Sequence, residues 1–169
     1  MTPVLERFLR YVAYDTQSRE GADTYPSTPG QFVLLRDLAA ELRTLGVADA
    51  AIDEFGYVMG TVPATSAKRT VPVIGFLAHV DTSPEMSGAG VRPIVHRAYD
   101  GRDLVLPDAP DAVLRVADSP YLGECLGHDI VTASGTTLLG ADNKSGVAAI
   151  MTAVEYLLAH PGIPHGAIR

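Results

Sequence analysis

Three stretches of the chain carry apolar residues at helical spacing. The first runs through residues 4–12, and the second runs through residues 32–45. The third, residues 143–160, is the most apolar and has alanines between its larger side chains. Apolar residues three or four positions apart lie on one face of a helix, so these stretches predict three helices. The alanines of the third stretch permit close approach, and we expect that helix to lie against a sheet.

Residues that are typical of helix termini flank the first two predicted helices. Thr2 and Pro3 occupy the places of an N-cap and a first helical residue. Thr28 precedes the second helix, and Gln31 stands three positions later, as in a capping box. Gly46 follows the last apolar residue and is expected to end that helix.

The strongest strand prediction falls on residues 71–80, which read VPVIGFLAHV. Nearly every side chain in this run is apolar, which is typical of a central strand buried on both faces. Shorter β-like runs occur at residues 51–53, 57–62, 130–132 and 136–139, and residues 163–169 resemble a turn and the start of a strand. Helices that alternate with buried strands predict an α/β fold with a mixed central sheet flanked by helices.

Composition narrows the class of protein. With 47% apolar and 20% charged residues in 169, the chain is expected to fold around a sizeable core. A net charge of −7 argues against a nucleic-acid binder and against binding to an anionic membrane. Cys125 is the single cysteine, so an internal disulfide is excluded and a reducing compartment is favoured. No signal-peptide or membrane-spanning stretch is evident, and we expect a cytoplasmic protein.

Several familiar catalytic motifs are missing. The chain has no G-x-S-x-G nucleophile elbow and no G-x-G-x-x-G after a strand. Residues 135–140 begin like a phosphate-binding loop, but Ala141 and Asp142 stand where lysine and serine or threonine are required. The carboxylates between residues 100 and 111 are interpreted as a solvated loop rather than a metal site.

His79 and Asp81 form the first candidate site. They stand at the end of the predicted buried strand, where open α/β sheets place their ligands. Residues two apart on a strand share a face, and an imidazole that binds a metal often donates its other N–H to a carboxylate. The alternative is a histidine and an aspartate that merely pair at a strand end.

Asp142 is the second candidate, within the run Gly140 to Gly146 where a loop enters the third helix. Its alternative role is an ordinary N-cap, for which aspartate is well suited. Taken together, an imidazole and a carboxylate at the exits of buried elements make half of a hydrolytic metal site. A carboxylate can also bridge two metal ions.

These motifs resemble the M20 family of dinuclear zinc peptidases. The resemblance rests on HVDTSPE (79–85) and GTTLLGADNKSGVAAIMTAVEYL (135–157), supported by PSTPGQ (26–31), YDG (99–101), LPD (106–108) and PHGAIR (164–169). It implies that His79 binds one zinc, that Asp81 is the catalytic carboxylate that orients His79, and that Asp142 bridges both zincs. It also implies a cis peptide bond after Asp142 and assigns no metal to Asn143.

The resemblance further implies a dizinc aminopeptidase that releases the N-terminal residue of tripeptides. Residues 1–169 would be the N-terminal part of a zinc-peptidase-like catalytic domain that is incomplete at its C-terminal end. A glutamate pair, further ligands and a lid and dimerisation domain would be absent from this chain, which alone would be inactive, whereas the full-length protein would be a homodimer. The alternatives are a dipeptidase or deacylase of the same family, or a non-catalytic truncated fragment.

Overall fold

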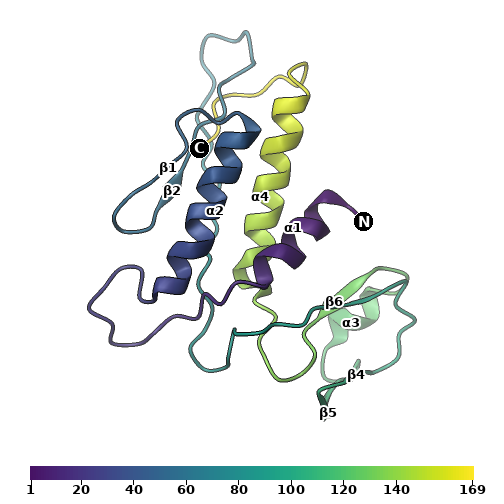
Figure 1. Cartoon of the computed structure of the whole chain (residues 1–169). Coiled ribbons are helices and arrows are strands. Elements are labelled where there is room, and N and C mark those ends of the chain that lie inside the picture. The colour runs from purple at the N-terminus through teal and green to yellow at the C-terminus, as the bar shows by residue number, and fades with distance from the viewer.

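The computed structural model describes all residues from 1 to 169 and contains three long helices (Figure 1). These are α1 (Pro3–Val12), α2 (Pro29–Leu45) and α4 (Ala141–Ala159), and all three were predicted from apolar spacing. A short helix, α3 (Pro120–Glu124), was not predicted. The strands are β1 (Ala51–Ile52), β2 (Val58–Met59), β3 (Ile94–His96), β4 (Leu104–Leu106), β5 (Ala109–Leu114) and β6 (Ile130–Thr132). None of the helices combines the length and the hydropathy that a membrane-spanning helix requires.

The main core lies between the three long helices. In Figure 1, α2 and α4 run side by side while α1 crosses the lower part of α4. Ala148 of α4 is completely buried, and its small side chain lets a neighbouring helix come close. The expectation that α4 lies against a sheet is therefore wrong, because its principal partners are helices. The core comprises Phe8, Tyr11, Val12, Leu34, Leu35, Leu38, Val80, Val147, Ala148 and Met151.

A charged network ties the three helices together beside this core. Arg7 of α1 donates from Nε to Glu41 Oε1 of α2 and from one Nη to Glu155 Oε2 of α4, both at 2.8 Å. The Tyr11 hydroxyl donates to Glu41 Oε2, also at 2.8 Å. Burial alone would raise the pKa of Glu41, but the hydrogen bonds from Arg10, Arg7 and Tyr11 outweigh it and hold that pKa below its ordinary value.

At the two ends of α2, the predicted C-terminal glycine is confirmed and the predicted capping box is not. Gly46 adopts the left-handed conformation, with φ of 102°, and ends the helix as predicted. The prediction of a capping box is wrong, because neither the Thr28 nor the Gln31 side chain caps the helix. Thr28 Oγ1 instead donates to the Gln17 carbonyl at 2.8 Å, and Gln31 Nε2 donates to the Thr16 carbonyl at 3.3 Å. Both side chains satisfy carbonyls of the preceding loop.

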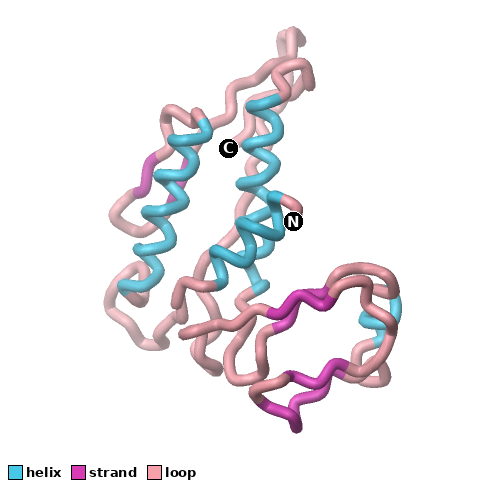
Figure 2. Tube along the Cα trace, turned by 45° about the vertical axis from the view of Figure 1, so that its right-hand side comes forward, coloured by secondary structure: helices cyan, strands magenta, loops and turns pink.

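The predicted mixed central sheet is not formed. The six strands make three separate two-stranded antiparallel sheets, which pair β1 with β2, β3 with β6 and β4 with β5. Figure 2 shows the last two pairs gathered to one side of the long helices. Residues 136–139 are not a strand, and Leu138 N–H donates to the Ser87 carbonyl at 3.0 Å within an irregular loop. The fold is thus mixed α/β, as predicted, but with small sheets.

The segment 71–80 is not the buried central strand that its composition predicted. Its backbone pairs along one edge, where Ile74 N–H donates to the Ala167 carbonyl at 3.1 Å and Phe76 N–H donates to the Arg169 carbonyl at 2.8 Å. Val73 is 61% exposed and Leu77 is 90% exposed. A strand is buried on both faces only where other layers cover it, and here only the end of the segment, at Ala78 and Val80, reaches the helical core.

Candidate metal site

The segment that carries His79 and Asp81 is fixed by the loop that follows α1. Thr16 Oγ1 donates to the Val80 carbonyl at 2.6 Å, and Thr82 N–H donates to the Thr16 carbonyl at 3.2 Å. Val80 and Thr82 are both buried. Side chains alternate along an extended backbone, so His79 and Asp81 face outward from the same segment.

Asp142 stands at an interruption in the helical geometry of α4. Gly140 precedes it in the left-handed conformation, with φ of 77°, and both Asp142 and Asn143 have non-helical backbone angles. The peptide bond between Asp142 and Asn143 is cis, as the family resemblance implied. No side chain caps this helix, and the Asp142 side chain is 94% exposed. The alternative role of Asp142 as an N-cap is therefore wrong.

The three candidate residues meet although they come from distant parts of the chain. His79 Nδ1 lies 3.0 Å from Asp81 Oδ1, and His79 Nε2 lies 3.1 Å from Asp142 Oδ1. One imidazole therefore stands between two carboxylates, each facing a different ring nitrogen. This convergence of His79 and Asp142 agrees with the expectation from the sequence.

The two contacts restrict the chemistry of the ring. A neutral imidazole has one N–H, so if Nδ1–H of His79 donates to Asp81, the lone pair of Nε2 faces an Asp142 oxygen. Two acceptors this close repel each other, and a cation bound by both atoms would remove that repulsion. Two ligands on one tetrahedral ion at 2.0–2.2 Å stand about 3.4 Å apart, close to the observed 3.1 Å. The geometry is thus compatible with a metal ion held by Nε2 and the Asp142 carboxylate.

An open cavity of about 480 Å³ lies over these groups. Its polar lining comes from the two segments that carry the candidate residues, and Leu138 and Leu139 supply apolar surface at one side. No group of three or more His, Cys, Asp or Glu side chains is arranged to hold a metal ion. The donor set facing one ion is therefore an imidazole nitrogen and a carboxylate, with the carboxylate of Asp81 turned to the other ring nitrogen.

Three other side chains of these types have structural partners. Asp108 pairs with Arg92 at 2.8 Å, and Asp100 pairs with Arg102 at 2.6 Å. His96 Nε2 lies 3.0 Å from the Thr132 hydroxyl across the β3–β6 pair.

Sequence reasoning missed Lys144, which lies two residues after Asp142. Lys144 is 1% exposed, and its Nζ donates to the Tyr14 carbonyl at 2.8 Å. Burial lowers the pKa of Lys144 to about 8, partly offset by the charge of Asp15. The helical spacing around Lys144 could have placed it on the inner face of α4. Its hydrogen-bonding partner could not be predicted from residue types, because that partner is a main-chain oxygen, which every residue has.

Comparison with known proteins adds an independent observation. No protein-family model matches the chain. Curated proteins named Peptidase T match it closely: those of Geobacillus sp. (strain WCH70) and Bacillus subtilis (strain 168) are each 52% identical over 166 residues, and that of Clostridium novyi (strain NT) is 47% identical over 169 residues. These alignments cover 98–100% of this chain, which spans only about 40% of the length of the relatives. The alignments agree with the resemblance inferred from the sequence segments, and along nearly its whole length the chain is similar to proteins named Peptidase T.

Proposed function

We propose that this chain forms part of the active site of a dizinc aminopeptidase that releases the N-terminal residue of tripeptides. The observation that carries the proposal is the position of His79 between Asp81 and Asp142. An imidazole nitrogen and carboxylate oxygens are ligands that zinc takes in hydrolytic enzymes. The similarity to proteins named Peptidase T supports the choice of peptides as substrates.

In this proposal the three side chains have different roles. Asp81 accepts the Nδ1–H of His79, which fixes the tautomer and directs the Nε2 lone pair outward. Asp142 offers two carboxylate oxygens on an exposed side chain, which suits a ligand shared by two ions. Zinc bound here would polarise the scissile carbonyl and lower the pKa of a bound water.

We further propose that the site needs groups from outside these 169 residues. A catalytic zinc normally has three protein ligands, whereas His79 Nε2 and Asp142 supply two to one ion. Residues 1–169 would then be the N-terminal part of a catalytic domain, with the remaining ligands, the general base, and a lid and dimerisation domain in further sequence. The complete protein would act as a homodimer, and the 169 residues alone would be catalytically silent.

Substrate discrimination in a longer polypeptide that contains this sequence tests the proposal. The panel is a tripeptide with a free amino group, its N-acetylated form, a dipeptide and an N-acyl amino acid, each assayed after chelation and after zinc is restored. We expect zinc-dependent release of the first residue of the free tripeptide only. Cleavage confined to the dipeptide or to the acyl amino acid would instead favour a dipeptidase or a deacylase.

Two variants make the assay specific to the proposed site. Asp142→Asn should abolish activity because it removes charge from the shared ligand. Asp118→Asn is the matched control, since Asp118 is also an exposed aspartate and its ion pair is a long 4.0 Å contact with Arg115. Equal activity in the two variants would remove Asp142 from the mechanism.

A further inference from the structure

Lys144 is a buried cation that the proposed ligand set does not use. It lies two residues after Asp142, where α4 takes up regular helical geometry, and its side chain is almost fully enclosed. Removing an ammonium group from water is costly unless the group is paired, and the hydrogen bond to the Tyr14 carbonyl supplies a partner. The Lys144 side chain therefore links the start of α4 to the end of α1.

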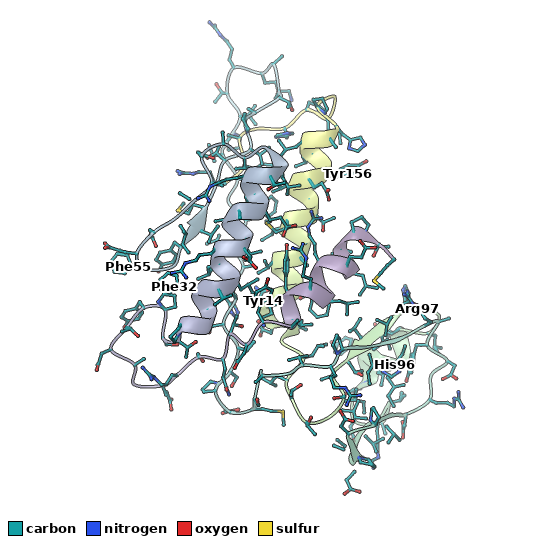
Figure 3. All side chains as sticks on the ribbon, viewed as in Figure 1. Tyr14, Phe32, Phe55, His96, Arg97 and Tyr156 are labelled. Atoms are coloured by element: carbon teal, nitrogen blue, oxygen red, sulfur yellow. The ribbon has the colours of Figure 1, made fainter.

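The Tyr14 carbonyl opens a segment that also holds the other half of the site. In Figure 3, Tyr14 lies beside the lower ends of α2 and α4. Beyond it, Thr16 bonds to both Val80 and Thr82, and Ser18 N–H donates to the Thr82 carbonyl at 2.9 Å. Residues 14–18, which we call the bracing segment, thus contact the His79 segment directly and the Asp142 turn through Lys144.

The two halves are also packed against each other at Gly140. A side-chain Cβ at this position would lie 3.3 Å from Thr82 Cγ2 and 3.5 Å from Lys144 Cδ. The Gly140 backbone therefore fits closely between Thr82, which follows Asp81, and Lys144, which follows Asp142. A shift of Lys144 would be transmitted to both sides of the site.

We propose that Lys144 is a positioning residue, whose buried ammonium holds the Asp142 turn against the bracing segment and so sets the distance between Asp142 and His79. This inference rests on the proposed function for its catalytic meaning, whereas the positioning itself can be measured in the chain without metal. Lys144 touches neither substrate nor metal in this scheme. It acts through the placement of Asp142.

The ¹⁵N chemical shifts of the His79 ring report this placement directly. We compare the wild-type chain, Lys144→Met and Asp142→Asn at one pH and without metal. Lys144→Met keeps most of the length of the unbranched side chain but cannot donate a hydrogen bond. We expect its His79 Nε2 signal to move most of the way to the value found in Asp142→Asn, where the contact with the carboxylate is altered directly. An Nε2 signal that stays at the wild-type value in folded Lys144→Met overturns the proposal.

Arg7→Met is the matched control. Arg7 is also a buried cation, but it joins α1 to Glu41 and Glu155 on the other two helices and does not contact the site segments. We expect this variant to lose stability and to keep the wild-type His79 signal. An equal displacement in Arg7→Met would show that general loosening moves the ring, and the specific role of Lys144 would be refuted.

Two further measurements keep the inference testable. If Lys144→Met does not fold, the wild-type chain should show coupling across the hydrogen bond between Lys144 ¹⁵Nζ and the Tyr14 carbonyl carbon, and its absence overturns the proposal. In a longer, active polypeptide, Lys144→Met should lower kcat/KM by about 10–100-fold, as is typical when a partner that orients a ligand is lost, and Lys144→Gln, which keeps a donor, should lose less. If the wild-type longer polypeptide has no aminopeptidase activity, the proposed function fails, while the ring shifts still decide the role of Lys144.

Discussion

Replacing Glu41 by glutamine tests how the three long helices are held together. The Glu41 carboxylate accepts hydrogen bonds from Arg7, Arg10 and Tyr11, and it is largely buried. Glutamine has nearly the same shape but no charge, and its one oxygen can serve only part of this set. Arg7, whose side chain is also largely buried, would then lose the more buried of the two carboxylates that pair with it.

The expected loss of stability follows from the geometry. Removing one partner of a fully buried ion pair costs about 3–5 kcal/mol. Arg7 keeps Glu155 at 2.8 Å, and the glutamine oxygen still accepts one hydrogen bond. We therefore expect Glu41→Gln to lower the free energy of unfolding by about 2–3 kcal/mol, below that range. Glu155 is 46% exposed, so Glu155→Gln should cost only about 0–1 kcal/mol.

Urea denaturation followed by helical circular dichroism measures both variants under the same conditions. Both substitutions remove a carboxylate from Arg7, but Glu41→Gln also weakens the hydrogen bonds from Arg10 and Tyr11. The difference between the two losses therefore reports the burial of Glu41 together with these additional partners. The denaturant slope should stay constant, which would assign the change to stability rather than to compactness. Equal losses in Glu41→Gln and Glu155→Gln would refute the argument.

Acid provides a second test, with a definite sign. The pKa of Glu41 is lower in the folded chain than its ordinary value of about 4.3. Its contribution to stability is therefore present above about pH 4.3 and is lost as the pH falls through the folded pKa. The stability curves of wild type and Glu41→Gln should converge in that range. A gap that stays constant into strong acid would contradict the assignment.

Three other predictions follow from burial and from the proposed site. Leu34→Ala should lower the free energy of unfolding by about 3–4 kcal/mol because Leu34 is completely buried, whereas exposed Leu77→Ala should change it by less than about 0.5 kcal/mol; equal effects in urea denaturation would contradict the described core. Asp81→Asn in a longer, active polypeptide should lower tripeptide hydrolysis by about 10–100-fold with little change in Tm, and unchanged activity would remove Asp81 from the mechanism. The 169-residue chain alone should release no amino acid from tripeptides even with zinc added, and cleavage with two tightly bound zincs would show that the proposed ligand count is wrong.

The helices could be predicted from sequence because their signal is local. Residues 4–12 and 32–45 repeat apolar positions at helical spacing, and Gly46 ends α2 where a left-handed residue is needed. The strand prediction for residues 71–80 failed because an apolar run says that a segment could be buried, not what would bury it. The capping box failed for a similar reason, since the side chain of Thr28 was already used by a carbonyl of the loop.

The candidate site was predicted in part. His79, Asp81 and Asp142 were named from residue type, position and family resemblance, and the structure brings their side chains together. The supporting contacts could not be predicted in the same way. Lys144 bonds to a main-chain oxygen of Tyr14, and Thr16 bonds to a main-chain oxygen of Val80. Such contacts depend on how distant segments cross, which spacing along the chain does not encode.

The one-sided pairing of residues 74–76 has a consequence for synthesis on the ribosome. Their hydrogen-bonding partners lie at residues 167–169, roughly ninety positions later along the chain. At about 5–20 residues per second, translation leaves this uncharged, extended segment without its partner for about 5–20 seconds. During that interval it presents unpaired backbone groups and apolar side chains to other nascent chains, which is the situation in which strands pair wrongly. The vulnerable period is therefore set by the distance along the chain to residues 167–169 as well as by the stability of the folded state.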